Sequence, residues 1–203
     1  MNTTIILIRH GLTDWNEEGR WQGNEDIPLN TTGIAQAQAL GRRLASWPIE
    51  SLYSSDLRRA AQTAAILGEA VDLQPIHDPS WRERDVGAFQ GLTWEEIKVQ
   101  FPKEYHEMGV GIFDPPQGED SHALYDRAVT AFSSLAARHS GQMIAVVSHG
   151  GFLHTTLLHI LGLPVGQYNR LSLRGNTGIN IVEISSGRPR LSRLNDTSHL
   201  EVY

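Results

Sequence analysis

Two histidines and three arginines stand at places in this sequence where they could bind an anion together. Arg9 and His10 directly follow one apolar run, His149 directly follows another, and Arg58 and Arg59 lie a few residues after a third. The planar guanidinium of arginine donates two parallel hydrogen bonds to pairs of oxygen atoms, which suits a phosphoryl group. If these side chains meet, they form a pocket for a phosphorylated ligand.

The elements that would position these residues alternate between strand and helix. Short apolar runs rich in β-branched residues predict strands at 3–8, 50–54, 73–77 and 143–147. Two or three further short strands are expected near the C-terminus, at 171–174, 179–185 and 190–195. Helical spacing of apolar residues predicts helices within 31–47, 57–67, 121–135 and 152–161. This alternation predicts an α/β fold: a three-layer sandwich whose central sheet is mostly parallel and flanked by helices. In such sheets ligands bind beyond the carboxyl ends of the strands, which is where the histidines stand.

Local signals mark where several elements begin and where loops lie. Asn30 is expected to start the first long helix, and Ser55 or Asp56 to cap the next one. Thr93 followed by Glu96 resembles a capping box. Residues 11–30 and the Pro- and Gly-rich stretch 101–121 have no clear period and are expected to be loops. We therefore expect a single domain over residues 1–203, in which 78–121 form a small cap.

The composition narrows the class of protein. The 203 residues include 17 Lys and Arg against 23 Asp and Glu, a net charge of −6, and no cysteine. An acidic chain binds nucleic acid and anionic membranes poorly, so neither is an expected partner. Without cysteine there is no disulfide, thiolate metal site or thiol nucleophile. The N-terminus lacks the basic region of a signal peptide and no run is long enough to span a bilayer, which favours a cytoplasmic protein.

Nine histidines raise the question of a metal site. His154 and His159 are five residues apart, which places them on different faces of a helix, and the spacings HxxxH and HExxH are absent. We therefore expect neither a metal nor another cofactor.

Several segments, in order along the chain, resemble the histidine phosphatase superfamily, the phosphoglycerate mutase-like proteins. The triplet Arg9-His10-Gly11 alone would prove little, but the ordered set is highly specific and covers essentially the whole chain. The further segments are Asn16 with Arg20-Trp21-Gln22-Gly23, 30–37, 53–64, 82–91 and 147–151.

The resemblance implies a role for individual residues. His10 would be the nucleophile, Arg9 and Arg59 would bind the phosphoryl group, Glu83 would be the proton donor, and His149 a second phosphate-binding histidine. Further substrate contacts would come from Asn16, Gln22, Gly23 and Gly150.

The chemistry implied is a phosphomonoesterase that passes through a phosphohistidine intermediate. His10 must be neutral to attack phosphorus, with its other ring nitrogen donating to a backbone carbonyl. A protonated His149 would join the arginines in stabilising the transition state. Glu83 would protonate the leaving oxygen and then deprotonate water. The competing interpretation of Glu83 is a structural ion pair with Arg82 or Arg84.

The family contains mutases as well as phosphatases, so both activities must be weighed. A mutase needs cations that hold a second acidic group, whereas residues 101–121 contain one cation, Lys103, among five acids. We therefore favour a phosphatase, more narrowly a phosphoric monoester hydrolase of the histidine acid type. Phosphoglycerate mutase is the alternative, favoured by the segment 87–91, and a non-catalytic protein that binds a phosphorylated ligand is a third.

The expected substrate is a small phosphorylated metabolite. Its identity would be read by residues 78–121 and by the loop after Gly11. Aromatic residues there could line an apolar pocket, although packing in the core or cap is the favoured explanation for most of them. The short C-terminal strands could pair across a homodimer, so this assembly is kept open.

Overall fold

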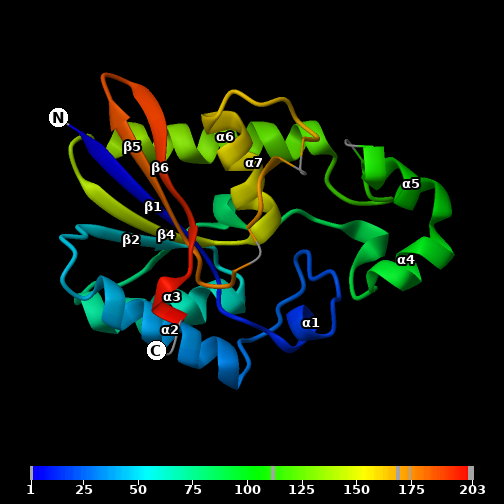
Figure 1. The fold of residues 1–203 in the computed structure, drawn as a ribbon, viewed down its shortest axis with the longest axis horizontal. Helices are drawn as coiled ribbons and strands as arrows, with labels where there is room; N and C mark the ends of the chain where they lie inside the picture. The colour runs from blue at the N-terminus through cyan, green and yellow to red at the C-terminus, as the bar shows by residue number, and fades with distance from the viewer. Residues whose placement is uncertain (1, 111–112, 168–169, 174, 201–203) are drawn as a thin grey trace.

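A six-stranded sheet lies at the centre of the molecule, in the order β3–β2–β4–β1–β5–β6 (Figure 1). The computed structural model describes residues 2–110, 113–167, 170–173 and 175–200. The strands are β1 (Thr3–Arg9), β2 (Ser51–Ser54), β3 (Ile76–His77), β4 (Met143–Ser148), β5 (Ile179–Ser185) and β6 (Arg188–Asp196). The pairs β3–β2, β2–β4 and β4–β1 are parallel, and β5 and β6 continue the sheet antiparallel. The mostly parallel α/β sheet is therefore confirmed.

The central strand β1 is apolar on both faces because helices cover both sides of the sheet. Ile5, Ile6, Leu7 and Ile8 are all fully buried. Ile5 and Leu7 belong to one hydrophobic cluster, whereas Ile6 and Ile8 belong to the other. A strand that is buried on both sides has no polar face, which explains the continuous apolar run in the sequence.

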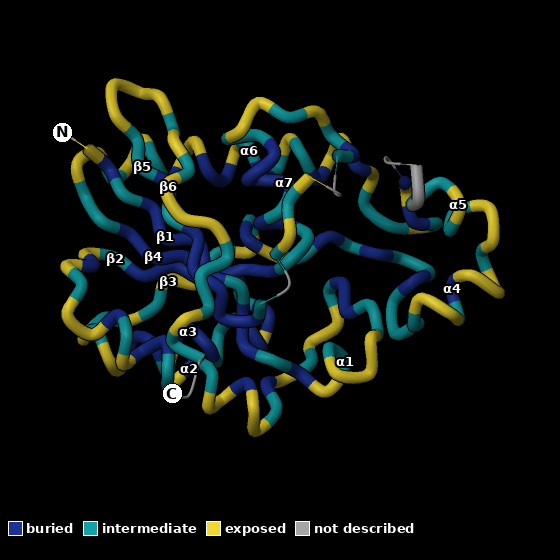
Figure 2. The backbone as a smooth tube through the Cα atoms, viewed as in Figure 1, coloured by how far each residue is buried: buried dark blue, intermediate teal, exposed yellow. Residues whose placement is uncertain are grey.

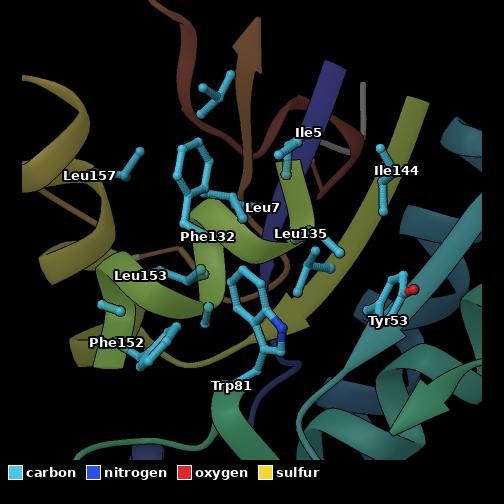
Figure 3. Close-up of a cluster of buried hydrophobic side chains, with 14 of the residues drawn as sticks. Ile5, Leu7, Tyr53, Trp81, Phe132, Leu135, Ile144, Phe152, Leu153 and Leu157 are labelled. Atoms are coloured by element: carbon cyan, nitrogen blue, oxygen red, sulfur yellow. The ribbon is translucent and has the colours of Figure 1, made fainter. Parts of the chain in front are cut away.

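Two helices pack on each face of the sheet, which completes the three layers. The helices are α1 (Asp14–Glu17), α2 (Thr31–Leu44), α3 (Arg58–Val71), α4 (Trp94–Gln100), α5 (Pro102–Val110), α6 (Ser121–Arg138) and α7 (Gly150–Ile160). α2 and α3 cover one face, and α6 and α7 the other (Figures 1 and 2). On the α6–α7 side, Trp81 and Phe152 pack edge to face, with ring centroids 5.5 Å apart (Figure 3).

The segment between β3 and α6 projects away from the sheet. It holds α4, α5 and the short 3₁₀ helices η1 (Pro79–Trp81) and η2 (Gly87–Phe89) (Figure 1). Its own small core, hereafter the cap core, consists of Val86, Phe89, Ile97 and Phe113 with partly buried aromatic neighbours. This separate core lets α4 and α5 stand away from the main sheet.

Two of the expected helix starts are confirmed. The Asn30 side chain accepts a hydrogen bond from the N–H of Gly33, and so caps α2. Thr93 and Glu96 form a reciprocal capping box at the start of α4.

Other local predictions are wrong. Neither Ser55 nor Asp56 caps α3; its N-cap residue is Leu57, and the N–H of Arg58 donates instead to the Asp26 carboxylate, 2.7 Å away. A partner that distant in sequence leaves no local signal. Helices α1 and α5 interrupt the predicted loops at 11–30 and 101–121. The strand predicted at 171–174 is not formed over residues 171–173, and residue 174 lies outside the described residues.

The start of α2 packs directly against the loop that follows the first strand. A Cβ atom on Gly33 would lie 2.1 Å from the carbonyl oxygen of Leu12, and one on Gly11 would lie 2.6 Å from the carbonyl oxygen of Gly33. Both contacts are with backbone, which cannot move aside cheaply. The loop after His10 is therefore held in place by close approach of two chain segments.

We expect Gly33→Ala to destabilise the fold by about 1–3 kcal/mol, because the new methyl group forces these segments apart. Urea unfolding measures the change. Gln38→Ala, at an exposed position of the same helix, should unfold like the wild type. Equal midpoints for Gly33→Ala and wild type would contradict this packing argument.

Candidate active site

Parallel pairing of β1 with β4 brings the two histidines together. Arg9 pairs with Ser148, and the N–H of His10 donates to the Ser148 carbonyl over 2.9 Å. The residues that follow, His10 and His149, are both buried, and their ring centroids are 5.2 Å apart. Residues 139 positions apart thus share one site because their strands end side by side.

Arg59 closes the same site from the first turn of α3. Its side chain is 1% exposed and donates to the carbonyls of Gly23 and Glu25, each over 2.7 Å, and to Nδ1 of His149 over 3.1 Å. Arg58 points elsewhere and is exposed. Of the two adjacent arginines, only Arg59 therefore belongs to the site.

His10 is held with one ring nitrogen engaged and the other open. Nδ1 lies 2.7 Å from the carbonyl oxygen of Gly11, so this nitrogen is the donor and Nε2 carries the lone pair. Burial, together with the charges of Arg59 and Arg9, holds the pKa of His10 well below its usual value of 6.5. The ring is therefore neutral at neutral pH, as a nucleophile must be.

His149 is also neutral, which corrects the expectation that it is protonated. Its Nδ1 accepts the hydrogen bond from Arg59, so the ring proton resides on Nε2. Burial, with the charge of Arg59 next in importance, holds its pKa well below 6.5. His149 thus offers one N–H donor, and among the described residues that Nε2 has no hydrogen-bond partner.

Arg9 is the second cation of the site. Nη1 donates to the Leu173 carbonyl over 3.1 Å, whereas the buried Nε finds no acceptor in the described part of the chain. Burial lowers the pKa of Arg9, and lowers that of Arg59 to about 10. Arginine side chains keep their charge in proteins, so both are cations at neutral pH. A Cβ on Gly150 would lie 3.4 Å from Nε of Arg9, so the backbone of Gly150 lies directly beside this cation.

Glu83 lies at the N-terminus of α7 and is not part of an ion pair with its neighbours. Its carboxylate accepts hydrogen bonds from the N–H groups of Gly151, Phe152 and Arg84, each over 2.9 Å. Arg82 pairs instead with Asp56, and Arg84 with Asp114. The structural ion-pair interpretation of Glu83 is therefore wrong.

The remaining residues from the sequence analysis line one cleft of about 880 Å³. Asn16 accepts hydrogen bonds from Thr13 and from the Asn176 side chain. Gln22 is nearly buried, and Gly23 holds Arg59 through its carbonyl. The cleft is lined by Arg9, His10, Asn16, Gln22, Gly23, Arg59, Glu83 and Gly150, and His149 is joined to this set by its hydrogen bond with Arg59.

Three residues that support this site did not emerge from the sequence. Thr63 accepts a hydrogen bond from the N–H of Gly11, and Asn176 donates to the His10 carbonyl over 3.0 Å. The N–H of Thr177 donates to the Arg9 carbonyl over 3.0 Å. Thr63 lies within a segment that carries the family resemblance, whereas Asn176 and Thr177 occupy a Gly-flanked stretch that indicates only a turn.

Chemically, the site combines a neutral nucleophile with donors that have no acceptor. Buried polar groups in proteins are nearly always hydrogen-bonded, and an unpaired one costs about 1–3 kcal/mol. Within the described residues, Nε of Arg9 and Nε2 of His149 have no hydrogen-bond partner, and the His149 ring lies 5.2 Å from the His10 ring between centroids. This arrangement suits an anion whose central atom His10 can attack.

Across the described ranges, no three His, Asp or Glu side chains gather closely enough to hold a metal ion. The same residues contain no helix of the length and apolar character needed to cross a bilayer.

Comparisons with known proteins agree with this arrangement. The sequence model that describes the histidine phosphatase superfamily (branch 1) matches residues 5–197 of this chain. Phosphoglycerate mutase-like protein 4 from Arabidopsis thaliana is 36% identical and covers 97% of this chain and 86% of its own. The metal-independent phosphoserine phosphatase of the same plant is 35% identical, covering 98% and 83%.

A solved structure shows the same fold. The phosphoserine phosphatase of Entamoeba histolytica, in complex with 3-phosphoglyceric acid, superposes with a TM-score of 0.89, 30% identity and coverage of 98% of this chain and 100% of that one. The family match spans nearly the whole sequence. His10, His149 and Arg59, which carried part of the resemblance, meet at the carboxyl ends of the central strands β1 and β4. This chain belongs to the histidine phosphatase superfamily.

Proposed function

We propose that this chain is a metal-independent phosphomonoesterase that hydrolyses a small metabolite phosphate through a phosphohistidine on His10. The observation that carries the proposal is the pair of unpaired buried donors, Nε of Arg9 and Nε2 of His149, beside the neutral His10 ring. A tetrahedral phosphoryl group has oxygen atoms to accept both and a phosphorus atom for His10 to attack. Relatives named as phosphatases support the same reaction class.

In the first step, Nε2 of His10 attacks phosphorus in line as the bond to the alcohol oxygen breaks. Arg9, Arg59 and the Nε2–H of His149 meet the equatorial oxygens, where charge accumulates in the transition state. The departing oxygen takes a proton from Glu83.

In the second step, Glu83 accepts a proton from water, and the water oxygen attacks phosphorus as the P–N bond breaks. Three N–H groups stabilise the carboxylate that the first step leaves behind. The same contacts fix the position of the carboxylate for proton transfer from water. Inorganic phosphate and neutral His10 are released.

Phosphoglycerate mutase is the second candidate, favoured by the similarity to a mutase-like plant protein. Against it, Lys103, the one cation of residues 101–121, is 81% exposed and pairs with Glu107. It does not line the cleft. We therefore favour hydrolysis over phosphoryl return to the product.

The finer features of the proposal follow from the sequence. We propose that residues 1–203 act as one catalytic unit of the histidine acid phosphatase type, in which 78–121 read the substrate. A sequence without cysteine needs no oxidising compartment, which supports the proposal that the protein is cytoplasmic. Edge strand β6 is the surface through which a homodimer would extend the sheet.

Substitution of the nucleophile and of the acid tests the reaction. With a ³²P-labelled phosphomonoester, wild type should release free phosphate and His10→Ala should take up no label. Glu83→Gln should reduce kcat by about 10²–10⁴-fold with a much smaller change in KM, because it removes the group that transfers the proton. Near-wild-type turnover in either variant would contradict these roles.

Incubation with 3-phosphoglycerate separates the two candidate activities. Formation of 2-phosphoglycerate instead of free phosphate would favour the mutase.

Stability should fall with acid because His10 and His149 are neutral when folded. Their folded pKa values lie below the unfolded value of 6.5, so the unfolded chain binds more protons as the pH falls below 6.5. The stabilisation is complete above that pH and is lost towards the folded pKa values. The free energy of unfolding should be measured in urea between pH 7.5 and 5. For His10→Gln, its slope against pH should be smaller than the wild-type slope by up to about 1.4 kcal/mol per pH unit. His106→Gln, at an exposed position, should keep the wild-type slope; equal slopes in all three proteins would contradict the assignment.

A further inference from the structure

An aromatic wall, made of Trp15, Trp21, Trp94 and Phe113, lines part of the cleft. Trp21 is its centre and makes edge contacts with Trp94 at 5.0 Å and with Phe113 at 5.8 Å between ring centroids. All three residues line the cleft, together with Trp15. Trp94 is 49% exposed, which is a high exposure for a residue of this size. The wall is therefore partly a surface and not wholly core.

The wall begins one residue from the proposed proton donor. Arg84 follows Glu83 in the chain, and its guanidinium stacks over the ring of Phe113 at 4.7 Å. On the proposed function, the oxygen that leaves phosphorus must lie beside Glu83. The rest of the substrate alcohol would then run along Phe113 and Trp21 towards Trp94.

Two arginines next to this wall, Arg84 and Arg20, already form ion pairs with carboxylates of the protein. Arg84 is 5% exposed and donates to Asp114, to two backbone carbonyls and to a hydroxyl group. Arg20 pairs with Glu18 and Glu96. A carboxylate on the substrate would have to compete with these partners. Arg170 also lines the cleft, but it is exposed, and exposed cations contribute little to binding.

We infer that the substrate is a phosphomonoester whose alcohol carries an apolar, preferably aromatic, group and no second carboxylate. Offset or edge contacts with Trp21 and Trp94 would bind that group, and burial of apolar area would add to the affinity. This inference rests on the proposed function and narrows its substrate class.

The test compares kcat/KM for 1-naphthyl phosphate, methyl phosphate and 3-phosphoglycerate. We expect 1-naphthyl phosphate to exceed 3-phosphoglycerate by at least about tenfold. Trp94→Ala should reduce kcat/KM for the naphthyl ester by about tenfold and leave that for methyl phosphate within about twofold. Val99→Ala, at a residue of the same helix that is 79% exposed, should match the wild type on every substrate.

The outcomes separate this inference from the proposed function. If 3-phosphoglycerate is hydrolysed as well as the naphthyl ester, or if Trp94→Ala slows all substrates equally, the aromatic leaving group is wrong and the phosphatase stands. If no ester is hydrolysed, the proposed function itself fails, and this inference with it.

A second, independent observation concerns the backbone behind the nucleophile. Thr177 is fully buried and has φ +55°, a left-handed conformation that a β-branched residue rarely adopts. Its N–H donates to the carbonyls of Arg9 and His10 over 3.0 and 3.4 Å. Asn176 adds a side-chain hydrogen bond to the His10 carbonyl and one to Asn16 over 3.3 Å. Strain of this kind persists only where surrounding contacts enforce it.

The C-terminal segment holds this turn in place. The Thr177 hydroxyl donates to the Asn176 carbonyl over 2.7 Å, so it can accept from Nε2 of His199, 2.9 Å away. Burial and the charge of Arg43 lower the pKa of His199 to about 4, so this ring is neutral at pH 7. The segment itself is fixed by the ion pair between Arg43 and Asp196.

We propose that Asn176 and Thr177 are positioning residues that fix the backbone of His10, so that its Nε2 is aimed at phosphorus. They act through the carbonyl groups of the nucleophile segment and touch no reacting atom. A small displacement of a nucleophile costs much more in rate than in substrate binding.

Asn176→Ala tests this role against a matched control. Asn180 is also buried, and its side chain donates to the Leu7 carbonyl of β1 over 3.0 Å, away from the nucleophile. Both variants should lose stability. Only Asn176→Ala should reduce the single-turnover rate of His10 phosphorylation, by about 10- to 100-fold, with KM within about threefold. If both variants phosphorylate at the wild-type rate, or both slow equally, Asn176 is merely structural.

Discussion

The site depends on the parallel pairing of β1 with β4, which ends both strands at the same level. Because Arg9 pairs with Ser148, the next residue of each strand is a histidine of the site. Arg59 then donates to His149 and fixes which of its nitrogens carries the proton. A shift of one residue in this register would turn one of the two histidines to the opposite face of the sheet. The core on each side of β1 therefore determines the chemistry as well as the stability.

Neutrality of the two histidines is the electrostatic consequence of this arrangement. Burial of the rings and two neighbouring guanidinium groups make a further positive charge costly, so the rings stay neutral and the arginines carry the charge. In the part of the chain that the structure describes, this arrangement leaves donors without acceptors at Arg9 and His149. On the proposed function, a bound phosphoryl group supplies acceptors for these donors.

The layers and the placement of the two histidines could be predicted because they follow from local patterns, whereas Glu83 and Asn16 were proposed only from the family resemblance. Apolar runs gave the strands on both sides of His10, and residues directly after strands gave His10 and His149. Long-range partners were not visible: the N–H of Arg58 is satisfied by Asp26, and the nucleophile is supported by Asn176. The proton on His149 was predicted wrongly because it depends on a single hydrogen bond from Arg59. Such contacts require the folded chain.

Location of the phosphoryl group on the trapped enzyme tests the central claim most directly. The protein should be quenched in alkaline denaturant during turnover and examined by ³¹P NMR with ¹⁵N-labelled histidine, which identifies the nitrogen bonded to phosphorus. We predict one phosphoramidate, on Nε2 of His10, because Nδ1 donates to the Gly11 carbonyl. A phosphoryl group on Nδ1, on another residue or on none would contradict the account.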